Sequence, residues 1–123
     1  MANDFTFGAV NLANNTRTLV YSVPTSPSGQ TAVIHSCTVA NTHGTDSVDV
    51  TLEVYDTSGT TYYPVSSTVP VPADSVLVLD GIKLNLEEDD KLYATSSHAS
   101  GHLTVFASVL RLHRNVISRK NST

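Results

Sequence analysis

The sequence lacks tryptophan, contains a single cysteine and carries few charged side chains. Charged residues make up 15% of the 123 residues, whereas hydrophobic residues make up 40%. A helical bundle of this size would be rich in Ala, Glu, Lys and Leu, so this balance favours an all-β protein. The lone Cys37 excludes an internal disulfide, and its place in a strand pattern predicts a buried, unreactive thiol.

Long apolar runs are also absent. No stretch approaches the roughly 18 consecutive apolar residues of a membrane-spanning helix. The first residues, MANDFTFG, lack the charged and then apolar layout of a signal peptide. We therefore expect a protein that is made in a cytoplasm and has no membrane partner. The length predicts one domain with a single two-layer core.

The clearest pattern in the chain is the alternation in residues 47–56, SVDVTLEVYD. Val48, Val50, Leu52 and Val54 fall on one face, and acidic, hydroxyl and aromatic residues fall on the other. A period of two predicts a strand with one buried and one solvated face. Such a strand needs neighbouring strands and an opposing layer to bury its aliphatic side chains.

Similar patterns, separated by short turns, recur along the chain and contain no long amphipathic helix. They predict an antiparallel β-sandwich of about eight strands, jelly-roll or Ig-like, with extended arms at both ends. We expect tight hairpins at residues 41–46, at Asp80-Gly81 and at residues 98–101. The predicted strands are residues 17–23, 31–42, 47–56, 61–65, 75–79, 82–86, 91–97 and 102–110.

Two details of these strands can be checked directly. In residues 31–42 the alternation places His35 on the same face as Cys37, as a hydrogen-bonded histidine of the core or its rim. Pro64, Pro70 and Pro72 each remove a backbone donor, so their segments are expected to be edge strands or irregular crossings that discourage aggregation.

The two ends of the chain differ from the middle. Residues 1–16 are predicted to be an arm, with residues 17–110 forming the sandwich and residues 111–123 a basic arm, for which an extension of the last strand is the alternative. The apolar residues of the first arm need a surface, on this domain or on another subunit; an ordinary first strand is the alternative. The residues expected to make contacts with other proteins are Phe5, Phe7, Val10 and Leu12 in the first arm and Arg111, Arg114, Arg119 and Lys120 in the second.

The last thirteen residues contain no acid, so a basic tail follows an acidic body. Such a modest charge suits an acidic protein surface or a neighbouring copy better than nucleic acid. We therefore expect a homo-oligomer with protein partners and no nucleic-acid partner.

No arrangement of residues predicts a catalytic, cofactor or metal site. Residues 87–90, EEDD, lack the alternating ligands and the glycine of a calcium loop and are expected to form a solvated turn. His98 and His102 flank one predicted turn without a third ligand for zinc. There is no nucleophile elbow and no phosphate-binding loop, so an enzyme is not expected.

A carbohydrate-binding module is the main rival class for a small β-sandwich. Tyr55, Tyr62 and Tyr63 could form a small platform near one turn, but adjacent residues in a strand point to opposite faces. At most two of these rings are therefore expected to line up, and the chain offers no tryptophan for a wider platform.

A succession of turn and core signals runs through about residues 18–110. Its positions are Val23-Pro24, Val39 to Thr42, Val48 to Val54, Pro72 to Gly81, Leu86 to Asp90 and Leu103 to Val109. This succession resembles small virion proteins of tailed bacteriophages. One departure is EEDD, at a turn where a glycine often occurs in those proteins.

This resemblance implies a structural component of the virion, made in the host bacterial cytoplasm and displayed in many copies. A capsid decoration or cement protein that binds the major capsid protein is the leading expectation. A neck, tail or baseplate component, or a module at the tail that binds a glycan or receptor, is the alternative.

Overall fold

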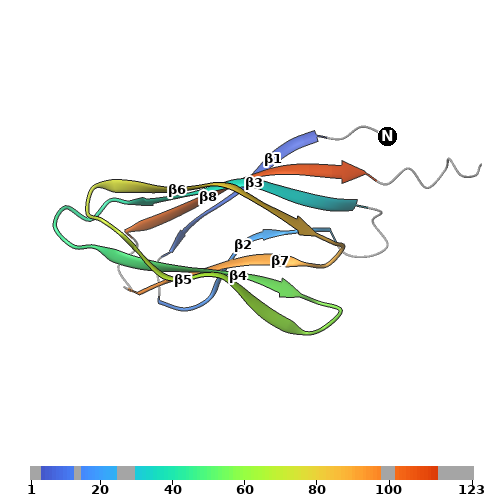
Figure 1. Cartoon of the computed structure of the whole chain (residues 1–123), viewed down its shortest axis with the longest axis horizontal. Helices are drawn as coiled ribbons and strands as arrows, with labels where there is room; N and C mark the ends of the chain where they lie inside the picture. Colours follow the sequence, from blue (N-terminus) through green and yellow to red (C-terminus); the bar gives the residue numbers. More distant parts are fainter. Residues whose placement is uncertain (1–3, 13–14, 25–29, 98–101, 114–123) are drawn as a thin grey trace, which may run out of the picture.

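The computed structural model describes residues 4–12, 15–24, 30–97 and 102–113, and Figure 1 shows their arrangement. The all-β class is confirmed, since these residues form strands and turns without a helix. The eight strands are β1 (Asp4–Leu12), β2 (Thr18–Ser22), β3 (Gln30–Asn41), β4 (Val48–Asp56), β5 (Thr61–Val71), β6 (Ser75–Leu86), β7 (Lys91–Ser96) and β8 (Leu103–His113).

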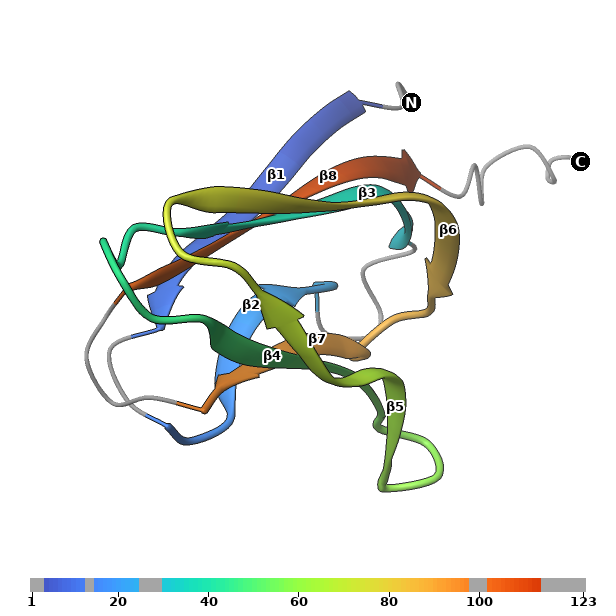
Figure 2. The ribbon, with the colours of Figure 1, turned by 60° about the vertical axis from the view of Figure 1, so that its left-hand side comes forward.

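The strands form two antiparallel four-stranded sheets that pack face to face (Figure 2). The first sheet has the order β1-β8-β3-β6, and the second has the order β2-β7-β4-β5. This order, in which successive strands mostly alternate between the sheets, is the eight-stranded jelly roll. It differs from the Ig-like order, so the structure decides between the two predicted sandwiches.

The core lies between the sheets and follows the predicted alternation. On β4, Val48, Val50 and Leu52 are fully buried, and Val54 packs against the core from a half-buried position. On β8 every second side chain is buried, as predicted. The fully buried residues of that strand are Leu103, Val105, Ala107 and Val109.

The hairpin predicted at residues 41–46 is wrong. β3 pairs with β8 and β6 in the first sheet, whereas β4 pairs with β7 and β5 in the second. Residues 42–47 therefore carry the chain from one sheet to the other. Period-two patterning identifies strands and their buried faces, but it does not identify which strand is the hydrogen-bonded neighbour.

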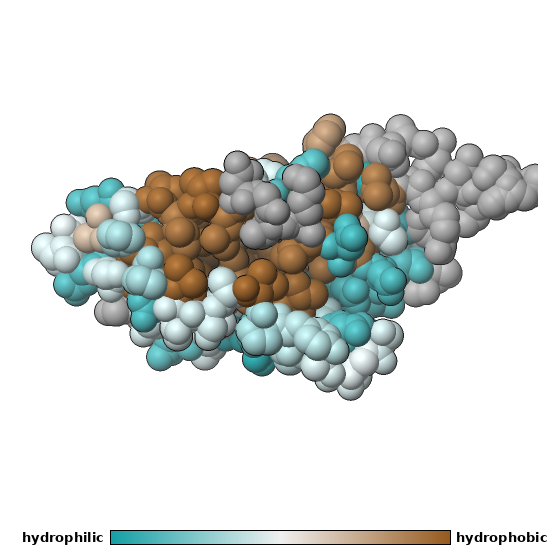
Figure 3. Space-filling view, in the orientation of Figure 1, coloured by the Kyte–Doolittle hydropathy of each residue, from teal (hydrophilic) through white to brown (hydrophobic). Residues whose placement is uncertain are grey.

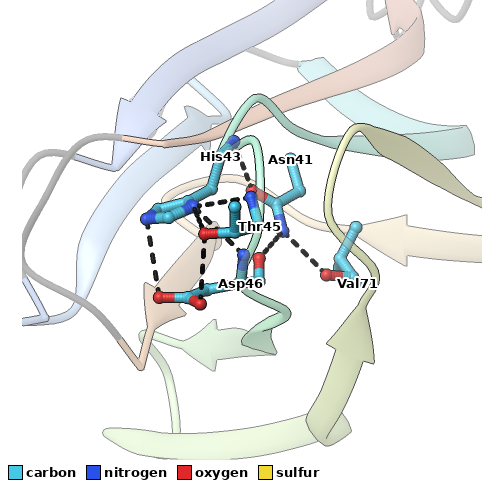
Figure 4. A network of polar contacts seen from close by, with 5 residues as sticks. All are labelled: Asn41, His43, Thr45, Asp46 and Val71. Atoms are coloured by element: carbon cyan, nitrogen blue, oxygen red, sulfur yellow. Dashed lines mark hydrogen bonds and ion pairs between the residues drawn. The ribbon is translucent and has the colours of Figure 1, made fainter.

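Buried Asn41 fixes this crossing (Figure 4). Its Nδ2 donates hydrogen bonds to the carbonyl oxygens of Asp46, at 3.0 Å, and Val71, at 2.8 Å. Its Oδ1 accepts from the backbone N–H of His43 at 2.9 Å. The Nδ1 atom of His43 in turn accepts from the backbone N–H groups of Thr45 and Asp46. One side chain thus joins the crossing to the end of β5.

The turn predicted at Asp80-Gly81 is also wrong, because β6 runs through it as one strand. The pairing of β3 with β6 shifts register there, between Ile34 and Ser36 on the β3 side. The pairing of β3 with β8 shifts between the same two residues, where β3 has one residue more than β8. This bulge changes which side chains of β3 face inward: Ile34 is buried before it, and Cys37 is buried after it. His35 therefore does not share a face with Cys37. A bulge adds one residue and reverses the alternation beyond it.

The expectation that the prolines mark an edge strand is confirmed for β5. This strand contains Pro64 and Pro70 and lies at the end of its sheet. Its pairing with β4 is irregular, and Thr68 has a positive φ of 48°. The turn at residues 57–60 connects β4 and β5 as a hairpin, which extends beyond the rest of the sandwich in Figure 2.

The acidic turn at residues 87–90 connects β6 to β7 across the two sheets. Its last residue differs from the prediction of a solvated turn, because the carboxylate of Asp90 is buried. That carboxylate accepts hydrogen bonds from the backbone N–H of Glu87, at 3.0 Å, and of Thr57, at 3.2 Å. Asp90 therefore connects two neighbouring turns at one end of the sandwich.

Residues 4–12 form β1, which pairs with β8 along its whole length. For these residues the structure shows the alternative of an ordinary first strand. The side chain of Leu12 is fully buried and Val10 packs against the core, so both residues complete this domain. The division of the chain into arms and domain stays a prediction for residues 114–123, which lie outside the described part.

The two sides of the sandwich close differently. On one side β1 lies close to β2 because Gly8 has no side chain: a Cβ there would lie 2.4 Å from the carbonyl oxygen of Val20. On the other side, between β5 and β6, the core residues are only half-buried. We call this line of side chains the β5–β6 seam; its residues are Val65, Val69, Leu77, Leu79 and Leu84.

Candidate interaction surface

The outer face of the first sheet carries the two most exposed aromatic side chains of the described residues. Phe5 and Phe7 on β1 are 76% and 59% exposed, and Phe106 on β8 is 41% exposed. The alternation that buries Leu12 and Val105 turns these three rings outward. These rings are exposed because alternate residues of the paired strands point outward, and not because they lie on an unpaired end of the chain.

Strand register brings the three rings together. Phe5 lies opposite Leu110, and Ala9 lies opposite Phe106. Phe7 and Phe106 are therefore diagonal neighbours, and their rings stack with centroids 4.9 Å apart and an interplanar angle of 11°. The ring of Phe5 packs against His35, with centroids 5.7 Å apart. We call Phe5, Phe7 and Phe106 the phenylalanine patch.

The described side chains between the phenylalanine patch and the far edge of the sheet are uncharged. Across β8 and β3 they are hydroxyl or aliphatic, and on β6 they are Val76 and Val78, which are more than half exposed; β6 then continues to Asp80, which aligns with Ser36. An exposed aromatic group surrounded by uncharged side chains is typical of a surface that contacts another protein. The outward residues between the patch and this edge are Val33, Ser36, Thr38, Ala40, Thr104, Ser108 and Leu110.

The predicted contact residues divide into four groups. Phe5 and Phe7 lie on the outer face, whereas Val10 and Leu12 face inward and are not available to a partner. Arg111 lies on β8 with a half-buried side chain and aligns with Ala32, which faces the core. The others, Arg114, Arg119 and Lys120, lie outside the described residues.

The sequence did not indicate Phe106 as part of the same surface as the N-terminal phenylalanines. Alternation along β8 turns Phe106 outward, but its proximity to Phe7 depends on the pairing of β1 with β8. These strands are the first and the last of the chain, and alternation within each strand carries no information about that pairing. The repeated spacing of Phe5 and Phe7 was the only available signal.

The outer face of the second sheet carries a different aromatic group. Tyr55 and Tyr62 face each other across β4 and β5, with ring centroids 4.6 Å apart, and Tyr93 on β7 lies 5.6 Å from Tyr62. The guanidinium of Arg17 lies 3.6 Å from the ring centroid of Tyr62 and donates to the carboxylate of Glu53 at 2.9 Å. We call these five residues the tyrosine cluster.

The tyrosine cluster is held together by its own contacts. The hydrogen bond to Glu53 raises the pKa of Arg17, and burial raises the pKa of Tyr93. Arg17 covers one face of the Tyr62 ring, so this face is not free to stack on a ligand. The prediction that at most two of Tyr55, Tyr62 and Tyr63 line up agrees with the structure, in which Tyr93 takes the third place.

Within the part of the chain that the structure describes, no group of three or more metal-binding side chains occurs. His102 packs edge-on against His43, with ring centroids 4.5 Å apart, while its predicted neighbour His98 lies outside the described residues. β7 and β8 belong to different sheets, so the turn expected between these two histidines is not a hairpin.

Cys37 is buried as predicted, with 1% of its surface exposed. Burial raises the pKa of its thiol to about 11.

A helix long and apolar enough to span a membrane is not found among the described residues.

Searches against protein-family models and against curated proteins find no match. Two solved structures are similar in fold. One is a chain of the Bacillus endospore appendages, which form disulfide-linked pili; it has a TM-score of 0.54 and 18% identity, with coverage of 93% of this chain and 88% of that chain. The other is a chain of the acid-stable capsid of Helicobacter pylori bacteriophage KHP30, with a TM-score of 0.53, 10% identity and coverage of 90% and 87%.

At these identities the similarity shows a common fold and no more. The match spans most of both chains in each case, so it concerns the whole sandwich and not one hairpin. The predicted jelly roll is therefore confirmed by strand order and by comparison with known structures. This chain has the β-sandwich fold found in structural proteins of a phage capsid and of a bacterial surface appendage.

Proposed function

We propose that this protein is a non-enzymatic structural component of a tailed bacteriophage virion, and specifically a decoration protein that binds the capsid shell in many copies. The observation that carries the proposal is the phenylalanine patch, which adjoins hydroxyl and aliphatic side chains on the outer face of the first sheet. The jelly-roll fold and its occurrence in a phage capsid structure support the same class of function.

The patch suits attachment to a large protein surface. Three aromatic side chains lie on two neighbouring strands of a rigid sheet, so they lose little conformational freedom on binding. Phe5 and Phe7 alone would each contribute roughly 1.5–3 kcal/mol on full burial. A repeated shell adds multivalent attachment, which turns a modest single contact into stable occupancy.

Substitution at the patch tests this function. We expect that the Phe5→Ser, Phe7→Ser double variant occupies purified particles at least about tenfold less than the wild type, because two anchors are lost. Occupancy is measured from the amount of protein that co-sediments with particles that lack it. Deletion of residues 1–12 is unsuitable, because it also removes buried Leu12 from the core.

A matched control comes from the second sheet. Tyr63 on β5 is 55% exposed, close to the 59% of Phe7, but lies away from the patch. The Tyr63→Ser variant should keep full occupancy. Equal occupancy of the double variant and the wild type would refute the proposed docking surface. Labelled protein located at the neck or tail would refute binding to the capsid shell and assign the protein to those parts of the virion.

A receptor-binding or glycan-binding module is the second candidate, and the tyrosine cluster is the observation that favours it. Tyr55 and Tyr93 flank Tyr62 beside a charged pair, a combination that also occurs where proteins hold sugars. A glycan array with the isolated protein separates the two functions. A decoration protein should bind no glycan, whereas binding that is lost in Tyr62→Ala would favour the module.

A further inference from the structure

The sandwich has four edge strands, and three of them are protected from pairing with another chain. β5 contains two prolines, and β2 is only five residues long and has a register shift between Leu19 and Tyr21. β1 is packed against β2 at Gly8. Prolines, irregular pairing, short length and cover from a neighbouring element are the usual ways in which proteins block exposed edges.

The first half of β6 has none of these protections. Residues 75–79, SVLVL, contain no proline and no charge, and their outer edge has no strand partner among the described residues. Val76 and Val78 are 55% and 56% exposed. An uncharged, apolar edge with unpaired backbone groups is a template for another strand.

The side chains next to this edge also lack full cover. Leu77 and Leu79 belong to the β5–β6 seam, where they are half-buried beside Val65 and Val69 of β5. Figure 3 shows hydrophobic residues gathered over β6 and between β6 and β5 on the face turned toward the viewer. A strand added at β6 would pair with its backbone and cover these side chains together.

We propose that residues 75–79 pair antiparallel with the same segment of a second copy of this chain, around a twofold axis. The first sheet of each copy, β1-β8-β3-β6, would then join that of the other copy in one continuous eight-stranded sheet. An axis through Leu77 places Val76 opposite Val78 of the second copy, and an axis through Val78 places Leu77 opposite Leu79 of the second copy. The first register joins residues 75–79 throughout, with Leu77 opposite Leu77 and Ser75 opposite Leu79. The second joins residues 77–79 and brings Val76 opposite Asp80.

A second copy fits this edge because residues 75–79 are apolar on both faces. A partner strand must therefore be apolar on both faces and must carry no charge along the paired stretch. The edge strands β2 and β5 are also uncharged, but of the four edges in the described part only β6, over residues 75–79, is free of proline, short length, irregular pairing and cover, so the same segment of a second copy meets the requirement. The inference concerns the isolated chain and is independent of the virion role.

Light scattering during size-exclusion chromatography tests the pairing, at protein concentrations from about 10 μM to about 1 mM. We expect a dimer that dissociates on dilution. Val78→Lys should weaken dimerisation at least about tenfold, since in the register about Val78 the two cations would face each other, and in the register about Leu77 each would lie opposite the apolar Val76 of the other copy. Asn11→Lys is the control, because Asn11 is exposed on the outer face of β1, at the opposite edge of the same sheet.

Cross-linking gives a second readout that does not depend on the lysine variant. A Val78→Cys protein alone, or mixed with a Val76→Cys protein, should form a disulfide-linked dimer under mild oxidation, because directly opposite strand residues lie within disulfide distance. Thr104→Cys on β8 should not. The pairing is refuted if the wild type is monomeric throughout this concentration range, if Val78→Lys remains dimeric, or if neither cysteine protein cross-links. A monomeric chain that still occupies particles would leave the proposed function intact.

Discussion

Individual polar residues in this protein matter mainly by joining segments that are distant in the sequence. Asn41 connects the β3–β4 crossing to the end of β5, and Asp90 connects the β6–β7 turn to the β4–β5 turn. In both cases a buried side chain satisfies backbone groups that would otherwise lack partners in the interior. The stability of the crossings should therefore depend on these few side chains.

Substitution of Asn41 tests this dependence. Asn41→Ala should lower the free energy of unfolding by about 2–3 kcal/mol, because it leaves the buried carbonyl of Val71 and the N–H of His43 without their partner. Urea denaturation followed by circular dichroism measures the change. Asn11→Ala, at an exposed position, is the control and should change stability by less than about 0.5 kcal/mol. Equal stability of the two variants would contradict the role of Asn41.

The thiol of Cys37 gives a prediction for pH. Its pKa is raised from 9.0 to about 11 by burial, so the folded state favours the neutral thiol. The stabilisation from this group is fully present below pH 9 and is lost as the pH rises toward about 11, since the unfolded chain ionises first. Labelling with a thiol reagent at about pH 8 should be slow in the folded protein and fast in urea. Equally fast labelling in both would contradict the burial.

At the scale of strands, the sequence predicts buried faces well and neighbours poorly. Alternation in residues 47–56 and 103–109 correctly gives the inward side chains, and the prolines correctly give β5 as an edge. The failures at residues 41–46 and at Asp80-Gly81 have one cause. Local turn signals favour hairpins, but tertiary packing sends the chain to the other sheet or continues the strand through a register shift.

The same limit applies to the candidate surface. Phe5, Phe7 and Leu12 were all predicted as contact residues from composition. Phe5 and Phe7 are exposed, but Leu12 lies in the core. Phe106 could be assigned to the patch only from the pairing of the first strand with the last. The tyrosine cluster likewise needed the register of β4 with β7, which places Glu53 opposite Tyr93.

Two glycine substitutions test whether β1 is seated on β2 in solution. Gly8→Ala should lower the free energy of unfolding by about 1–3 kcal/mol, because the new Cβ would meet the backbone of Val20. Gly44→Ala is the matched control, since no atom lies within 4 Å of the position that its Cβ would take. Thermal or urea unfolding measures both. Two equally stable variants would favour an N-terminal arm that lies elsewhere.

At the scale of the whole molecule, the two sheets present different outer surfaces. The first sheet carries the uncharged phenylalanine patch, and the second carries the tyrosine cluster with its ion pair. If the first faces the shell, the second faces outward and remains open to the solution. The basic residues at the end of the chain would then act by charge, separately from the patch.

Charge reversal in the tail tests that separation. The Arg114→Glu, Arg119→Glu double variant should occupy particles less than the wild type at low salt and nearly as well at high salt, because screening removes the attraction. Arg111 is left unchanged, because its half-buried position on β8 could affect folding. Co-sedimentation at several salt concentrations measures the effect. A loss that is independent of salt would contradict an electrostatic role.

The alternation of successive strands between the sheets also affects how the protein reaches its native state. β1 must find β8 at the other end of the chain, and β3 must find both β6 and β8 before its hydrogen bonds are complete. Such distant pairings are slow to form, because a long loop must close before any contact is gained. During this search the apolar residues of β6 are open to other newly made chains. Chaperones and the rate of synthesis should therefore strongly affect the yield of folded protein.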